Sequence, residues 1–230
     1  MSAALDDRSQ RLAALRSHLA TVAPVRSRPR GIPLGIAALG ELHWPRPGLS
    51  EVSGMPGSGR LGLVLPAMAA LTQAGQEVAL IDVLGQLYPP GLSGVRLDQV
   101  LLVRPGRSQV AWAAEQIARS GVCPLVVLID PPRLGPGARR LQHAAEAGGV
   151  SLIVVSERPD PGLPAALRLA TPRAGQALIS KDGRGARERV VELTGASRPL
   201  LLSSRLRAQP PESAGSMHPD EGIEVVDSGA

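Results

Sequence analysis

Short apolar runs alternate with helical patterns along the middle of this chain, and this order limits the folds available to it. Strands are expected at residues 49–53, 78–82, 101–104, 125–130 and 150–156. Helical patterns lie among them at residues 60–74, 109–120 and 138–147. Strands that alternate with helices form parallel sheets with helices on both faces. We therefore predict an α/β fold with a mainly parallel sheet flanked by helices.

The later part of the core has a different pattern, with three short strands and little helix between them. These strands are expected at residues 166–171, 176–180 and 188–194, with a turn marked by Gly183 and Gly185 before the last. Residues 32–47 contain three prolines and are expected to be irregular. Pro66 should kink its helix, because proline lacks the amide proton that a helix interior needs. Together these elements define a core domain over residues 32–207.

Aromatic residues are nearly absent from the 230 residues, although 43% of the chain is hydrophobic. Trp44, Tyr88 and Trp112 are the only three, so the core should be aliphatic and little material remains for stacking nucleic-acid bases. Cys123 is the single cysteine, which excludes an internal disulfide, and its apolar neighbours predict a small buried side chain. The four histidines show no metal-ligand spacing, so no metal site is expected.

The N-terminal segment, residues 1–31, is predicted to be an amphipathic helix followed by a linker. The helix has a narrow apolar stripe that includes Leu12, Leu15, Leu19 and Val22. The linker carries Arg26, Arg28 and Arg30, which are candidates for contact with DNA. Such a helix either packs on its own domain or docks on another protein, and the sequence leaves both alternatives open.

The C-terminal segment, residues 208–230, is predicted to be a disordered acidic tail. It holds five acidic residues and no lysine or arginine, whereas the rest of the chain holds 25 basic and 15 acidic residues. A basic body suggests an anionic partner with which the tail could compete, and the alternative is a solvated arginine-rich surface. The sequence has neither a signal peptide nor a run of about 20 apolar residues, so a soluble cytoplasmic protein is expected.

A loop between the first strand and the first helix resembles a phosphate loop, which has the form G-x-x-x-x-G-K-[ST]. Gly54 and Gly59 have the required spacing, and Gly57 lies between them. Arg60 stands at the position of the lysine that neutralises phosphate charge, and Leu61 stands at the position of the hydroxyl that binds Mg²⁺. A guanidinium is a wide fork rather than a compact charge, and leucine cannot ligate a metal.

These changes leave three interpretations of the loop. It can be a glycine-rich turn kept for the geometry of the fold, a weak nucleotide or anion site, or a working hydrolase. Hydrolysis is the least favoured interpretation. Lys181 is the only lysine in the chain, and no nearby residue is expected to replace the lysine that the loop lacks. A helix N-terminus can still attract an anion without these side chains. We expect no cofactor and no catalytic residue.

The order and spacing of these segments are similar to the RecA superfamily over roughly residues 48–195. The similarity rests on the segments Glu51-Val-Ser-Gly-Met-Pro-Gly-Ser-Gly-Arg-Leu61, Ala79-Leu-Ile-Asp82, 97–105, 114–121 and Leu125-Val-Val-Leu-Ile-Asp130. Within the superfamily the chain most resembles the ImuA family of accessory proteins of bacterial mutagenesis cassettes. That likeness rests on Trp44-Pro-Arg-Pro-Gly48 before Leu49-Ser-Glu-Val, on Leu80-Ile-Asp82, and on residues 139–149.

The resemblance implies a RecA-like scaffold without the catalytic residues. The catalytic glutamate of RecA corresponds to Leu84, and Asp130 matches the strand-end acid that helps hold Mg²⁺. The glutamine that senses nucleotide in RecA is replaced by Ser156-Glu-Arg-Pro159 and a short connection. In RecA an N-terminal helix and linker dock on the neighbouring protomer, which suggests the same role here.

The family resemblance also implies a function and partners. It implies a non-catalytic accessory protein of SOS-induced translesion DNA synthesis that binds RecA and the polymerase-like partner ImuB within a translesion polymerase complex. Restraint of RecA recombination is a further implication. The alternative is a weak ATP-binding or DNA-binding protein of the RecA superfamily.

Overall fold

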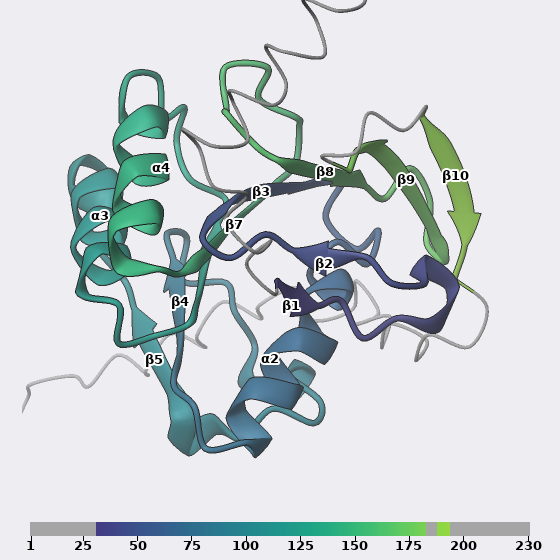
Figure 1. Cartoon of the computed structure of the whole chain (residues 1–230), viewed down its shortest axis with the longest axis horizontal. Helices are drawn as coiled ribbons and strands as arrows, with labels where there is room; N and C mark the ends of the chain where they lie inside the picture. Colours follow the sequence, from purple (N-terminus) through teal and green to yellow (C-terminus); the bar gives the residue numbers. More distant parts are fainter. Residues whose placement is uncertain (1–30, 183–187, 194–230) are drawn as a thin grey trace, which may run out of the picture. The chain divides into compact units, whose positions relative to one another are not determined.

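The computed structural model describes residues 31–182 and 188–193 (Figure 1). In this part of the chain an eight-stranded sheet has the order β10-β9-β8-β3-β7-β6-β4-β5. Its strands are β3 (Gly48–Ser53), β4 (Val78–Asp82), β5 (Val100–Val103), β6 (Leu125–Ile129), β7 (Ser151–Ser156), β8 (Leu167–Ala170), β9 (Gln176–Lys181) and β10 (Arg189–Glu192).

The strands from β8 to β5 run parallel, and β9 and β10 join the sheet antiparallel to their neighbours. The helices are α2 (Leu65–Gln73), α3 (Val110–Ser120) and α4 (Gly137–Gly148). The 3-10 turns are η1 (Ala37–Leu39), η2 (Leu61–Leu63), η3 (Pro89–Gly91), η4 (Leu97–Gln99) and η5 (Arg107–Gln109). The predicted α/β fold with a mainly parallel sheet is confirmed.

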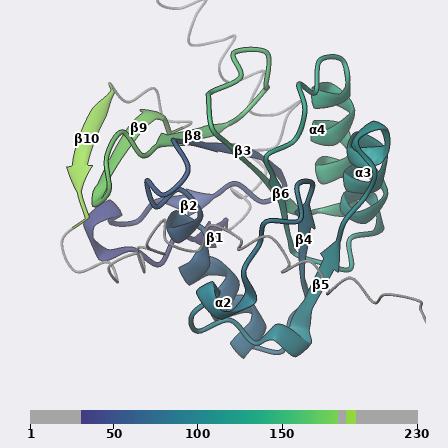
Figure 2. The same ribbon diagram turned by 180° about the vertical axis from the view of Figure 1, so that it is seen from behind.

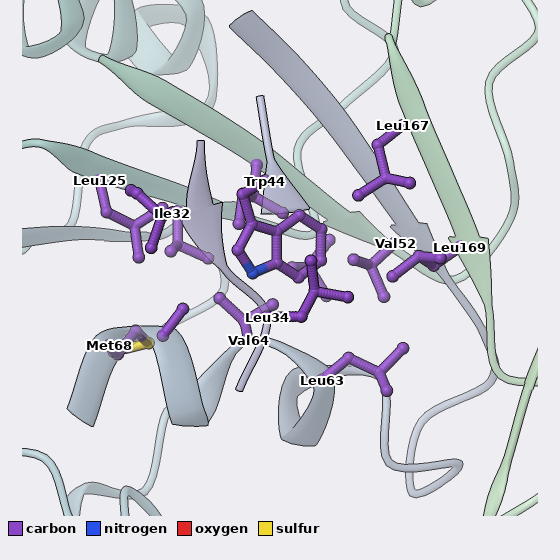
Figure 3. Packing of buried hydrophobic residues seen from close by; sticks show 14 of the residues in the cluster. Ile32, Leu34, Trp44, Val52, Leu63, Val64, Met68, Leu125, Leu167 and Leu169 are labelled. Atoms are coloured by element: carbon purple, nitrogen blue, oxygen red, sulfur yellow. The ribbon is translucent and has the colours of Figure 1, made fainter. Parts of the chain in front are cut away.

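Two hydrophobic clusters lie on opposite faces of the sheet. One is formed with α3 and α4, and the other with α2 and the hairpin of β1 (Ile32–Pro33) and β2 (His43–Trp44) (Figures 1 and 2). The second cluster surrounds Trp44, which is fully buried against Leu34 and Val64 (Figure 3). The predicted aliphatic core is therefore wrong at this point, because one indole fills the space between the hairpin and the sheet.

Tight packing joins α3 and α4 through glycine. A Cβ atom built on Gly148 would lie 1.9 Å from the carbonyl oxygen of Ala118. A Cβ atom on Gly121 would lie 2.8 Å from the carbonyl oxygen of Gly148, and Gly121 ends α3 in the left-handed conformation with a φ of 70°. The two helices approach this closely because neither position carries a side chain.

Two predictions about the first hundred residues are wrong. Residues 32–47 are not irregular throughout, because β1 and β2 form a two-stranded antiparallel sheet in which Ile32 is opposite Trp44. The expected helix over residues 60–74 begins as the 3-10 turn η2 and becomes α-helical only in α2. Pro66 consequently lies in the first turn of α2, where the missing amide proton is tolerated, and it does not kink a helix interior.

The predicted domain boundaries at residues 31 and 207 stay predictions. The segments beyond them lie outside the described residues, as does the turn at Gly183 and Gly185. Cys123 is buried as predicted, with 1% of its surface exposed, and burial raises the pKa of its thiol.

Candidate phosphate-loop site

The sheet topology brings the predicted site residues together. β3, β6 and β7 are parallel, so their carboxyl ends lie at one edge of the sheet, where α/β proteins bind ligands. The loop 54–59 follows β3, and Asp130 follows β6. Ser156 ends β7, and its carbonyl oxygen accepts a hydrogen bond of 3.1 Å from the amide of Gly54. The loop is thereby attached to the edge at which Asp130 lies.

Arg60 and Asp130 form a bidentate ion pair at the base of this site. Nη1 of Arg60 lies 2.8 Å from Oδ1 of Asp130, and Nη2 lies 2.6 Å from Oδ2. The two side chains are only 12% and 20% exposed. A planar guanidinium matches a carboxylate in this geometry, which a lysine ammonium would not reproduce. The charge that a phosphate loop offers to its ligand is thus bound to a carboxylate of the same chain.

The backbone of Asp130 is arranged for this contact. Asp130 has a φ of 47°, a left-handed conformation that few residues other than glycine adopt. Its amide donates a hydrogen bond of 2.8 Å to the carbonyl oxygen of Val155 in the neighbouring strand. Asparagine and aspartate tolerate this conformation best among the residues with side chains. The left-handed backbone of Asp130 ends the extended conformation of β6, and the carboxylate of Asp130 contacts Arg60.

The three loop glycines are required for different reasons. A Cβ atom on Gly54 would lie 2.0 Å from Oγ1 of Thr171 and 2.6 Å from Oγ of Ser58. Gly57 and Gly59 have open space around them, but their φ values of 83° and 91° are strained for any other residue. Ser58 and Thr171 share a hydrogen bond of 2.6 Å, which attaches the loop to the end of β8. These contacts explain the glycine pattern without a ligand.

A hollow of about 560 Å³ opens beside the ion pair. Its polar lining comes from both members of the pair and from Gln86, Ser156, Glu157 and Arg158. Its apolar lining comes from Pro56, Leu84 and Pro131. Arg158 is 88% exposed at its side chain and lies 3.9 Å from Glu157. The Arg60 guanidinium is already paired with Asp130, so the accessible positive charge of the hollow is that of Arg158.

Comparison with known proteins gives partial matches to RecA. RecA of Bacillus licheniformis is 37% identical over 106 residues, which are 44% of this chain and 30% of that protein. RecA of Streptomyces ambofaciens is 32% identical over 118 residues, which are 50% of this chain and 32% of that protein. The described core is RecA-like. No protein-family model matches the chain, and the chain spans about a third of the length of these curated relatives.

Two leucines stand at positions singled out in the sequence, Leu61 at the hydroxyl position of the phosphate-loop pattern and Leu84 at the position that the resemblance to RecA matched with a catalytic glutamate. Leu61 is partly buried and packs against the hydrophobic cluster beneath the loop. Leu84 is 47% exposed and lines the hollow. Asp82, two residues earlier, is buried and accepts hydrogen bonds from the amides of Gln86 and Leu87 at 3.1 and 3.0 Å. It thereby holds the turn that presents Leu84 to the hollow.

A buried ion pair between Glu51 and Arg168 was missed by the sequence reasoning. Glu51 lies in the middle of β3 and is 1% exposed, and its Oε2 accepts a hydrogen bond from Nη1 of Arg168 in β8. Its Oε1 accepts a hydrogen bond of 2.6 Å from the amide of Asp160. Nη2 of Arg168 donates to the carbonyl oxygens of Asp160 and Leu163 at 3.1 and 2.5 Å. The sequence signal that could have indicated this pair is a charged residue inside each of two apolar strands, Glu51 in β3 and Arg168 in β8.

This pair holds the connection between β7 and β8 against the RecA-like core. Desolvation by burial raises the pKa of Glu51, while the hydrogen bond from Asp160 and the charge of Arg168 oppose that shift. The connection, residues 157–166, begins with two residues that line the hollow. The position of residues 157–166 therefore depends on the buried ion pair of Glu51 and Arg168.

Other predicted site residues lie outside the described part of the chain. They are the apolar stripe of Leu12, Leu15, Leu19 and Val22 and the linker residues Arg26, Arg28 and Arg30. Their roles in binding a partner and DNA stay predictions. Among the residues that the structure describes, no three His, Cys, Asp or Glu side chains are grouped so that they could hold a metal ion. No helix in residues 31–182 or 188–193 has the length and apolar character needed to span a membrane.

Proposed function

We propose that this chain is a non-catalytic RecA-like accessory protein of SOS-induced translesion DNA synthesis, which binds RecA and the polymerase-like protein ImuB. The observation that carries the proposal is the bidentate pair of Arg60 and Asp130 inside a RecA-like core. Phosphoryl transfer requires cationic groups and Mg²⁺ to neutralise the developing charge. In this site the guanidinium of Arg60 is bonded to a carboxylate of its own chain, so it is not available to neutralise the charge of a phosphate.

Two further features support a role in binding rather than in hydrolysis. Leu61 packs into the core where a metal-binding hydroxyl would be needed, and Leu84 lines the hollow where an acid would activate water. RecA proteins are similar to this chain over about half of its length, which supports a partner from the same pathway. The likeness to the ImuA family noted from the sequence supports ImuB as the second partner. Restraint of RecA recombination is part of the same proposal.

The first experiment measures phosphate release from ATP by the purified protein with Mg²⁺ and single-stranded DNA. We expect no release above the background of a sample without protein. The double variant Arg60→Lys, Leu61→Thr gives the loop the residues of an active phosphate loop, and it should remain inactive because Leu84 cannot activate water. Turnover by the wild-type protein would contradict the non-catalytic role.

The second experiment measures direct binding to RecA with and without single-stranded DNA and ATP, and follows RecA strand exchange in the same samples. We expect binding, reduced strand exchange, and loss of both in Leu15→Asp and Leu19→Asp. Val22→Ile, which keeps the apolar stripe, is the matched control and should bind normally. Failure to bind RecA in every nucleotide state would reject RecA as a partner. Failure to co-purify with ImuB would reject ImuB.

A weak anion site is the second candidate, and it is favoured by the hollow beside the loop. The amides of Gly57 and Gly59 donate no hydrogen bond to any described residue, so they are available to an anion. Titration calorimetry with ATP, with and without Mg²⁺, tests this candidate. Heat that inorganic phosphate abolishes by competing with ATP would support it. No heat at millimolar ATP would exclude it.

A further inference from the structure

Asp130 binds the guanidinium of Arg60 through the donors that a phosphate would use. Both terminal nitrogens of Arg60 donate to the carboxylate, to Oδ1 at 2.8 Å and to Oδ2 at 2.6 Å. Arginine binds carboxylates and phosphates alike through two parallel hydrogen bonds of this kind. A phosphate can therefore take these two donors only after the carboxylate has released them.

The backbone of Asp130 fixes the position of this carboxylate. Among the residues that the structure describes, Asp130 is the only one other than glycine with a positive φ, at 47°. Such a strained residue persists only where its surroundings hold it. The amide of Asp130 donates a hydrogen bond of 2.8 Å to the carbonyl oxygen of Val155, which attaches the residue to the neighbouring strand. The carboxylate is thus placed against Arg60 by the end of the sheet.

The hollow beside the pair has the size of a small-molecule site. Its volume of about 560 Å³ lies within the range of such sites. Its charged lining consists of Arg60 and Arg158, which are positive, and of Asp130 and Glu157, which are negative. These four charges sum to zero, and neutralising Asp130 alone leaves a net charge of +1. The carboxylate of Asp130 is therefore the group whose removal makes the hollow favourable for an anion.

The remaining side chains of the site define the class of anion. Leu61 packs into the core and offers no oxygen to a metal ion, so the loop does not favour a magnesium complex of a phosphate. Two guanidinium groups, those of Arg60 and Arg158, line the same hollow. Two cations suit an anion that carries several phosphate groups better than a single phosphate. The chemistry fits a metal-free polyphosphate, either inorganic or the triphosphate of a nucleotide.

We propose that Asp130 is a built-in competitor that closes a polyphosphate site at this loop. In the wild-type protein the ligand must break the ion pair before it contacts Arg60. The apparent affinity is then the intrinsic affinity reduced by the fraction of molecules in which the pair is open. This inference explains why the anion site considered above as the second candidate is weak, and it does not depend on RecA or ImuB as partners. A wild-type protein that gives no heat with ATP is the result expected of a closed site.

Titration calorimetry of the full chain with inorganic triphosphate, in buffer that contains EDTA, tests the proposal. Asp130→Asn removes the charge, keeps the size of the side chain and tolerates the left-handed backbone. We expect it to bind triphosphate at least about tenfold more tightly than the wild-type protein does. Asp98→Asn is the matched control, because it breaks a bidentate pair with Arg96 that precedes β5 at the other edge of the sheet, and it should bind like the wild type. Equal affinities of Asp130→Asn and the wild type would overturn the proposal.

A double variant tests whether the released guanidinium is the group that binds. Asp130→Asn, Arg60→Met should lose the affinity that Asp130→Asn alone gains. Circular dichroism and urea denaturation of each variant show that it is folded under the conditions of the titration. Tight binding by the double variant would mean that Arg60 does not contact the ligand and would refute the proposal. Binding that requires Mg²⁺ would do the same, since the site is argued to act through arginine.

The same titration of Asp130→Asn with ATP separates the two sources of polyphosphate. Binding of both ligands would support the proposal and show that the site recognises the phosphates alone. Binding of inorganic triphosphate without ATP would support it for inorganic anions only. Binding of ATP without inorganic triphosphate would mean that the nucleoside, not the phosphates, is recognised, and the proposal would be wrong.

Discussion

Replacing Arg168 by methionine should destabilise the fold strongly. The substitution removes the counterion of Glu51, whose side chain is 1% exposed, and three hydrogen bonds that Arg168 donates. Breaking a buried ion pair by removing one member costs about 3–5 kcal/mol, because an uncompensated charge remains in the interior. The amide of Asp160 still donates to Glu51, so we expect a value at the lower end of this range. Urea denaturation at neutral pH measures the free energy of unfolding.

The companion variants separate the charge from the packing. The double variant Glu51→Gln, Arg168→Met should be more stable than Arg168→Met, because no charge is left buried. Arg119→Met removes an exposed ion pair with Glu115 and should cost only about 0.3–0.5 kcal/mol. A cost for Arg168→Met no larger than that of Arg119→Met would refute the reasoning, because it would mean that Glu51 is adequately solvated without its partner.

The cost of Arg168→Met should also depend on pH in a defined direction. The pKa of Glu51 is raised above 4.5 in the folded protein, so the folded state holds this proton to higher pH than the unfolded chain does. The contribution of Glu51 to stability is therefore complete below pH 4.5 and is lost as the pH rises through its folded pKa. Removing Arg168 raises that pKa further. The variant should lose less stability in mildly acidic than in neutral buffer, and an equal loss in both would contradict this.

Three other predictions concern packing, the loop and the thiol. Gly148→Ala should cost about 1–3 kcal/mol in urea denaturation, since its methyl group would overlap the carbonyl oxygen of Ala118, and a neutral result would refute the close approach of the two helices. Arg60→Met and Asp130→Asn should be non-additive by about 0.5–3 kcal/mol in a double-mutant cycle, whereas strict additivity would deny the ion pair. Cys123 should react with a thiol reagent only when the protein unfolds, and rapid labelling of the native protein would contradict its burial and raised pKa.

The sheet could be predicted because its central strands are buried on both faces. Such strands are continuous apolar runs, and β4 has the predicted bounds at residues 78–82. The hairpin of β1 and β2 could not be predicted in the same way, since two-residue strands have no periodicity and three prolines obscured them. Pro66 was placed in a helix interior because the 3-10 turn before α2 continues the apolar spacing of the helix.

The site could be predicted as a set of positions but not as a set of contacts. Gly54 and Arg60 were identified from the loop pattern, and Asp130 was identified from the resemblance to RecA. The ion pair joins residues that are 70 positions apart, and the left-handed turn at Asp130 that permits it has no signature in the sequence. The pairing of Glu51 with Arg168 spans 117 positions and depends on β3 and β8 being neighbours in the sheet.

The ion pair of Arg60 with Asp130 also bears on how the protein responds to conditions inside a cell. A protein whose loop is neutralised by a bound nucleotide gains stability in proportion to the logarithm of the nucleotide concentration, so its melting temperature follows the energy state of the cell. In this chain the neutralising carboxylate is covalently part of the fold and is present at all times. We expect the melting temperature of the purified protein to stay the same over the range of ATP concentrations found in energy-starved and in growing cells.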